Sequence, residues 1–150
     1  MKSKIMRYGI MIVAFGLLAG ITVAVYVFNK PKRDIAKTAA EYSLTATQLM
    51  TEFTKDEQAA NAKYLSAAYG KVISVSGTIG EIDQAGDTSL NILLKEPTMG
   101  SGSINCSMQK SEIPKAKSLK VGDNVAVKGE CTGYLDIINE VSLVKCLLEE

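Results

Sequence analysis

Three cysteines are the residues of this chain best suited to chemistry, because a thiol can bond a second thiol, bind a metal or act as a nucleophile. They are Cys106, Cys131 and Cys146, and no two of them have the C-x-x-C spacing of a structural zinc site. The chain contains no histidine, which removes the commonest metal ligand and the usual general base. We therefore expect no catalytic residue, no metal site and no cofactor.

The carboxylates and glycines form no stronger enzymatic motif. Asp83 and Asp87 flank an expected turn, but their spacing does not match a Ca²⁺-binding loop. The glycine-rich residues 98–103 lack the lysine of a phosphate-binding loop. The sequence thus predicts a protein that binds a partner and is not an enzyme.

The N-terminal segment predicts a membrane anchor. Residues 8–28 contain no charged residue, asparagine, glutamine or proline, and as a helix they would be about 31 Å long, which matches a bilayer core. A cleavable signal peptide has a shorter apolar core and ends in small residues, whereas this segment ends in bulky and then basic ones. We expect a basic N-terminus at 1–7, an uncleaved transmembrane helix at 8–28 and a linker at 29–44.

The flanks of this anchor indicate where the protein resides. Both flanks are basic, but a very short basic N-terminus favours its retention in the cytoplasm. We expect a single-pass protein of the cell inner membrane with its C-terminal domain in the periplasm. Gly16 and Gly20 have the G-x-x-x-G spacing through which two anchor helices could pair into a homodimer.

Two short helices are predicted to follow the linker, in a helical segment over residues 45–66 that packs on the next domain. Asp34 is expected to cap a short helix that runs through Tyr42. Thr45 and Gln48 have capping-box spacing at the start of a helix over about 46–53. Thr54 and Glu57 repeat that spacing before a helix over about 55–65.

Alternating apolar residues then predict a small barrel over residues 70–150. Five short strands, with a polar connection between the third and the fourth, follow the order of an OB-fold, a small Greek-key barrel. Gly77 interrupts the long first strand, where the strand must bend to pair at both ends of the barrel. The fold class is mainly β: a five-stranded OB-fold barrel preceded by a single transmembrane helix and two short helices.

Four stretches of the sequence carry a resemblance to a known family: TATQLMTEFTKDEQAANAKY, GKVISVSGTIGEID, VGDNVAVKGECTGYL and VSLVKC. Together they resemble the bacterial OB-fold family named for its likeness to tRNA anticodon-binding domains (tRNA_anti-like), over about residues 40–147. The resemblance implies an OB barrel with N-terminal helices, often behind a membrane anchor or a lipoprotein signal. It implies no known activity, since fold alone does not give function.

The outward face of the second and third strands is the best candidate binding surface in the sequence. It is polar, and oligosaccharides are among the ligands of OB-folds. Its members are Asn91, Ser103, Asn105, Ser107 and Gln109. The alternative is a solvated sheet face without a ligand.

Nucleic acid fits this surface poorly. Single-strand binding needs a basic groove and aromatic rings for stacking. Residues 34–150 carry eleven basic and sixteen acidic residues, a net charge of −5, and the expected face has no aromatic residue. We expect nucleic-acid binding to be absent and the partner to be an envelope protein or a glycan.

The cysteines themselves are predicted to be structural. In OB strand order the fifth strand lies between the third and the fourth, so Cys146 is adjacent to both other thiols. If the domain is exported, a Cys131–Cys146 disulfide is expected, with Cys106 left as a buried thiol. The alternative is three buried thiols that act as small hydrophobic residues.

These observations predict a membrane-anchored OB-fold binding or scaffold module of the bacterial envelope. The alternative is a single-stranded nucleic-acid-binding OB domain that faces the cytoplasm.

Overall fold

The computed structural model describes residues 16, 19–25, 34–66 and 70–149. The chain divides into two compact units, residues 1–33 and residues 34–150. In the first unit residues 19–25 are helical. No helix among the described residues is both long enough and apolar enough to cross a membrane. The predicted basic N-terminus at 1–7 and most of the predicted transmembrane helix at 8–28 lie outside the described residues.

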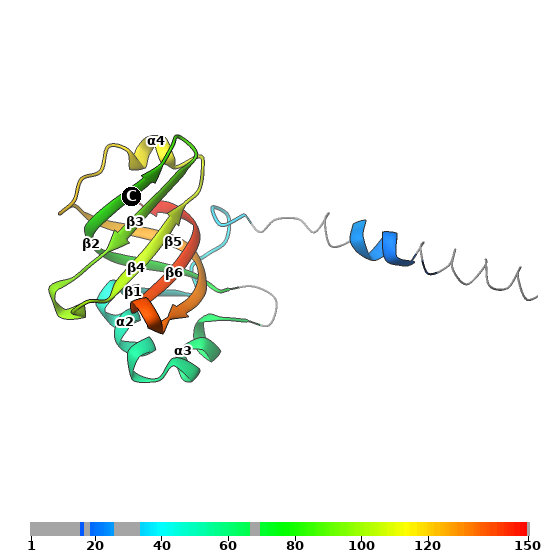
Figure 1. The fold of residues 1–150 in the computed structure, drawn as a ribbon, viewed down its shortest axis with the longest axis horizontal. Coiled ribbons are helices and arrows are strands. Elements are labelled where there is room, and N and C mark those ends of the chain that lie inside the picture. The colour runs from blue at the N-terminus through cyan, green and yellow to red at the C-terminus, as the bar shows by residue number, and fades with distance from the viewer. Residues whose placement is uncertain (1–15, 17–18, 26–33, 67–69, 150) are drawn as a thin grey trace, which may run out of the picture. The chain divides into compact units, whose positions relative to one another are not determined.

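The second unit is mainly β, a closed five-stranded barrel with a few helices (Figure 1). An extra short strand, β1, adds to the sheet at its start, and the strand order is β1-β2-β3-β4-β6-β5 with closure between β2 and β5. The strands are β1 (Tyr42–Thr45), β2 (Val72–Ala85), β3 (Ser89–Leu94), β4 (Ser103–Met108), β5 (Asn124–Leu135) and β6 (Glu140–Glu149).

The first strand of the barrel, β2, pairs with other strands at both ends of the barrel, as the glycine at position 77 predicts. Residues 72–78 of β2 pair with β5, and Ile79 to Ala85 pair with β3, with a register shift between Ile79 and Glu81. A Cβ atom on Gly77 would lie 2.9 Å from the Ala46 Cβ, and one on Gly80 would lie 2.6 Å from the Lys95 Cβ. Close approach of neighbouring elements therefore requires glycine at both positions.

The segment before the helices differs from the prediction. Asp34 accepts a hydrogen bond from the Ala36 N–H at 3.1 Å and caps only a single turn. The chain then becomes extended, and Tyr42 to Thr45 pair in parallel with β2. The predicted short helix through Tyr42 is therefore wrong, because Tyr42 packs edge-on against the Tyr64 ring, with centroids 5.4 Å apart, from a strand position.

Two helices follow β1: α2 (Ala46–Lys55) and α3 (Glu57–Tyr64). The capping box of Thr45 and Gln48 forms as predicted. The second predicted cap is wrong, because Asp56 is the N-cap of α3 and accepts from the Ala59 N–H at 2.9 Å. The Thr54 hydroxyl instead donates to the Met50 carbonyl within α2.

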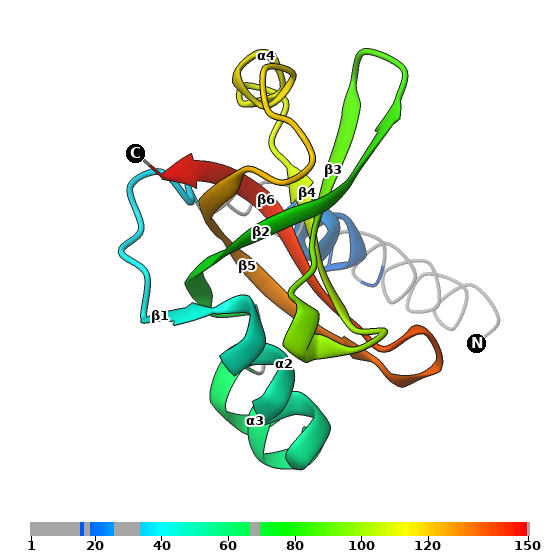
Figure 2. The same cartoon turned by 90° about the vertical axis from the view of Figure 1, so that its left-hand side faces the viewer.

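The short helical elements close the two ends of the barrel. They are the 3₁₀ turn η1 (Pro97–Met99), the helix α4 (Ile113–Ala116) and the 3₁₀ turn η2 (Asp136–Ile138). In Figure 2, α2, α3 and the β5–β6 hairpin lie at one end, while α4 and the β2–β3 turn lie at the other. The core lies inside the barrel and continues under α2 through Leu49, Met50 and Phe53.

Candidate functional site

The predicted polar face exists only in part. Asn91 lies opposite Ser107 on neighbouring strands, and Asn105 shares their outward side. Ser103 is buried, with 5% of its surface exposed. Gln109 lies beyond the end of β4, in the wall of a separate hollow with Lys115 and Lys128.

A carboxylate further changes the character of this face. The parallel pairing of β4 with β6 places Glu140 opposite Ser103. Glu140 Oε1 accepts a hydrogen bond from the Asn105 amide at 3.0 Å, and its Oε2 lies 3.5 Å from the Ser103 hydroxyl. The centre of the face thus holds an internal hydrogen-bond cluster, in which Asn105 Oδ1 has no hydrogen-bond partner among the described residues. Asn91 and Ser107 are the other polar groups of the face.

The three cysteines are buried, free thiols in the structure. Cys131 lies opposite Leu143 of β6, whereas Cys146 lies opposite Met108 of β4. Interaction with the Cys106 side chain, and then burial, raises the pKa of Cys146 well above its usual value. The structure thus brings Cys146 to Cys106, and the Cys131–Cys146 disulfide stays a prediction.

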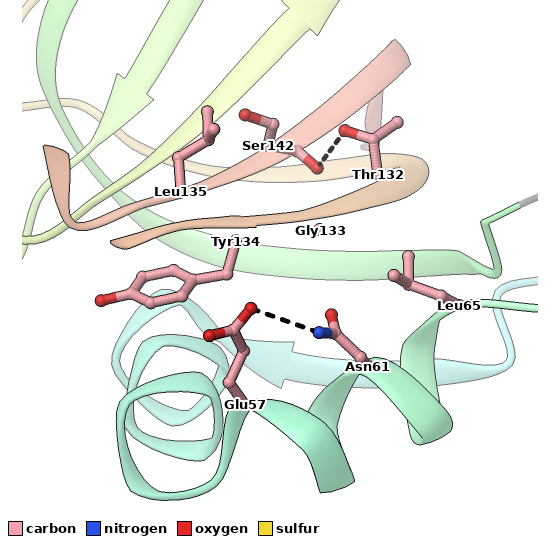
Figure 3. Close-up of a pocket in the computed structure, with 8 residues that line it drawn as sticks. All are labelled: Glu57, Asn61, Leu65, Thr132, Gly133, Tyr134, Leu135 and Ser142. Carbon is pink, nitrogen blue, oxygen red and sulfur yellow. Dashed lines mark hydrogen bonds between the residues drawn. The ribbon is translucent and has the colours of Figure 1, made fainter. Parts of the chain in front are cut away.

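A groove that sequence reasoning missed lies at the other side of the β5–β6 hairpin. Pairing between β2 and β5 ends at Val72 and Glu130, and the Cys131 N–H donates to the Lys71 carbonyl at 3.0 Å. Beyond a register shift at Thr132, Gly133 to Leu135 pair with β6 alone among the described residues. Helix α3 runs beside this free edge (Figure 3). The hollow between them has a volume of about 420 Å³ and is lined by Glu57, Asn61, Leu65, Thr132, Gly133, Tyr134, Leu135 and Ser142.

A second hollow adjoins the first and shares Glu57 and Tyr134 with it. Its volume is about 490 Å³, and its lining is Phe53, Thr54, Glu57, Tyr134, Asp136 and Asn139. We refer to the two hollows together as the helix–strand groove. Its size falls in the range of ligand sites, which are typically about 300–1,000 Å³.

The floor of the helix–strand groove is aromatic. Phe53 stacks on Tyr134 with ring centroids 5.8 Å apart, and on Tyr64 at 5.7 Å. The Tyr134 hydroxyl donates a hydrogen bond to Asn139 Oδ1 at 2.7 Å, which fixes the ring against the hairpin. Burial, and then the negative charges of Asp136 and Glu57, raise the pKa of Tyr134. The ring is therefore a neutral, rigid platform at physiological pH.

One wall of the groove is positioned by an ion pair between the two helices. Lys63 Nζ of α3 lies 2.7 Å from Glu52 Oε2 of α2, and the Tyr64 hydroxyl donates to the same oxygen at 2.8 Å. The Lys63 hydrogen bond lowers the pKa of Glu52. These contacts fix the angle at which α3 presents Glu57 and Asn61 to β5.

Asn61 supplies an acceptor that no described group uses. Its amide nitrogen donates to Glu57 Oε1 at 3.4 Å, one helical turn away. Its Oδ1 is shielded from solvent and has no hydrogen-bond partner among the described residues, and in Figure 3 it points from α3 toward β5. A buried acceptor without a donor costs free energy until one arrives.

The hairpin beside the groove is apolar and acidic. Leu135, Ile137 and Ile138 expose 51%, 98% and 57% of their surfaces. Between residues 129 and 144 the chain has three acidic residues and no basic one. In the sequence, residues 135–138 (LDII) could have indicated this site, because they are mostly apolar in a hairpin where polar turn residues are usual.

The barrel and its helical cap define the class of protein: the second unit is an OB-fold domain with a groove suited to binding. The chain matches the family model described as tRNA_anti-like over residues 1–147, and it belongs to that family, as the sequence motifs predict.

A solved structure with a TM-score above 0.5 supports the fold. A proposed nucleic acid-binding lipoprotein of Klebsiella pneumoniae is similar with a TM-score of 0.55 and 16% identity, over 71% of this chain and 91% of that one. Asparaginyl-tRNA synthetase of Entamoeba histolytica has a TM-score of 0.40 and 20% identity, over 58% of this chain and 23% of that chain. The Stn1–ten1 complex of S. pombe has a TM-score of 0.39 and 18% identity, over 53% of this chain and 58% of that chain. No curated protein matches the sequence.

Proposed function

We propose that this protein is a membrane-anchored binding or scaffold module of the bacterial envelope. Residues 8–28 hold it in the inner membrane, and residues 34–150 recruit a protein or a glycan in the periplasm without catalysing a reaction. The length and apolar composition of residues 8–28 support the anchor. The basic N-terminus supports the orientation.

The helix–strand groove is the observation that carries the binding role. It combines an aromatic platform at Tyr134, an unused acceptor at Asn61 and exposed apolar residues at the hairpin tip. Binding sites typically join a mostly apolar surface to a few fixed polar groups. Among the described residues, no strand pairs with this edge of β5 beyond the point where its pairing with β2 ends.

The location is tested by fusing alkaline phosphatase, and separately green fluorescent protein, to Glu150. The proposal expects an active phosphatase and a dark fluorescent protein, because the first folds only after export and the second fluoresces in the cytoplasm. The reverse pattern would place the domain in the cytoplasm and overturn the envelope assignment. Gly16→Leu with Gly20→Leu should weaken self-association of the anchor if Gly16 and Gly20 pair two chains.

The second candidate is a single-stranded nucleic-acid-binding domain that faces the cytoplasm, and the description of the Klebsiella relative favours it. The net charge of −5 and the acidic groove argue against it, since phosphates require basic contacts. We expect no appreciable binding of the full chain to a fluorescent deoxythymidine oligomer at physiological salt. Micromolar anisotropy binding that weakens steeply with added salt would favour this second function.

A further inference from the structure

We propose that the helix–strand groove binds an extended polypeptide segment, rich in basic and apolar side chains, that lies along the free edge of β5. This inference rests on the proposed function and names the class of partner. Three features carry it: the strand edge, the charge of the groove and the apolar tip.

The strand edge supplies backbone hydrogen-bonding groups. In an antiparallel ladder, alternate residues point their N–H and C=O groups away from the partner strand. Gly133 to Leu135 have β6 on one side and the groove on the other, and Thr132 lies at a register shift just before them. Three residues span about 10 Å, enough to pair with a short extended segment. Addition of a strand to an exposed edge is a common mode of peptide recognition.

The negative charge of the groove favours basic side chains in the bound polypeptide. Its lining contains Glu57 and Asp136 and no lysine or arginine. Lys63, the nearest basic residue of α3, is held by Glu52 between the helices. A basic side chain in the groove would find two carboxylates and the face of the Tyr134 ring, which favours a cation. A nucleic acid would meet the same carboxylates with its phosphates.

The exposed apolar residues at the hairpin tip enlarge the proposed binding surface. The absence of basic residues around them argues against a membrane as the partner. Ile137 exposes 98% of its surface and stands beside Asp136. Segments that lie on anionic bilayers carry basic residues around their apolar ones. The hairpin has none between residues 129 and 144. A polypeptide with apolar residues between basic ones fits both the tip and the groove.

The test uses the full chain in lipid nanodiscs and a phage-displayed library of random dodecapeptides. The expected result is enrichment of peptides with more basic than acidic residues and with apolar residues between them. Synthetic versions should lose about tenfold in affinity for Glu57→Gln with Asp136→Asn, and a similar factor for Ile137→Ser. The matched control, Asp83→Asn with Asp87→Asn, removes two charges from the opposite end of the barrel and should change affinity less than twofold.

Hydrogen exchange then locates the occupant. Peptide binding should slow amide exchange in residues 132–135 and leave residues 89–94 unchanged. Protection on β3 and β4 instead, enrichment of acidic peptides, or no enrichment would each overturn the inference. Groove binding of chitohexaose, an oligonucleotide or anionic vesicles in place of peptides would overturn it as well. The chitohexaose outcome would leave the proposed envelope function intact, and the reporter fusions test that function separately.

Discussion

The outer face of β3 and β4 and the helix–strand groove both carry polar side chains, but they are built differently. The face comes from alternation within two strands, and its central groups, Ser103 and Asn105, are bonded internally to Glu140. The groove forms where the pairing between β2 and β5 ends and where helix α3, 60–80 residues earlier in the sequence, approaches β5. Its side chains are hydrogen-bonded as well, Asn61 to Glu57 and Tyr134 to Asn139, but no strand pairs with its edge of β5 among the described residues. Local polarity therefore identified a face, while tertiary structure forms the groove to which we propose to assign binding.

The largest effect should come from removing the floor of the groove. Phe53 exposes only 1% of its surface and stacks on Tyr64 and Tyr134. We expect Phe53→Ala to lower the free energy of unfolding by about 3–5 kcal/mol, because it leaves a cavity beneath Tyr134. Phe53→Leu should cost about 1–2 kcal/mol. Urea denaturation followed by circular dichroism measures both, and equal stability of Phe53→Ala and wild type would show that the floor is not part of the core.

Stability at alkaline pH should test how well the Cys131 thiol, which lies just before the free edge of β5, is shielded from water. Burial raises the pKa of Cys131 from 9.0 to about 11. The folded state therefore holds its proton where the unfolded state has lost it, so stability is complete below pH 9 and falls as the pH rises through 11. We expect a loss of about 2–3 kcal/mol from this thiol. Cys146 contributes in the same direction.

Thermal unfolding at several pH values in the presence of reductant measures this loss. Cys131→Ala should show a shallower decline between pH 9 and 11 than the wild type. A decline that is identical in the two proteins would mean that Cys131 is exposed to water in solution.

The sequence predicted the five barrel strands, the two helices and the first capping box because these depend on local alternation and capping chemistry. It could not predict that β1 forms, since Tyr42–Thr45 is extended only through pairing with residues 73–76 of β2. It misplaced the cap of α3, because Asp56 and Thr54 are both good caps and the turn between the helices decides between them. Glu57 and Tyr134 were missed as site residues because their proximity follows from tertiary packing.

A smaller effect is expected from the ion pair that sets the wall of the groove. Lys63 lowers the pKa of Glu52, so the contribution of this pair is present above pH 4.5 and is lost as the pH falls. Both side chains are about two-fifths exposed, at 38% and 40%, so Glu52→Gln should cost at most about 1 kcal/mol. In this variant the free energy of unfolding should fall less steeply as the pH is lowered into the acid range (the acid limb). An unchanged acid limb would show that the pair does not form in solution.

The smallest effect is expected on the β3–β4 face, and it decides between the two surfaces. Asn91 and Ser107 make no side-chain hydrogen bond among the described contacts, so Asn91→Ser with Ser107→Ala should change the free energy of unfolding by less than about 0.5 kcal/mol. Affinity for a selected basic dodecapeptide should stay within twofold of wild type, because the peptide lies against β5. Isothermal titration of this variant beside Glu57→Gln with Asp136→Asn makes the comparison direct. A large loss of affinity in the face variant, with the groove variant unaffected, would transfer the binding site to the polar face and leave the groove as an uncovered seam of the fold.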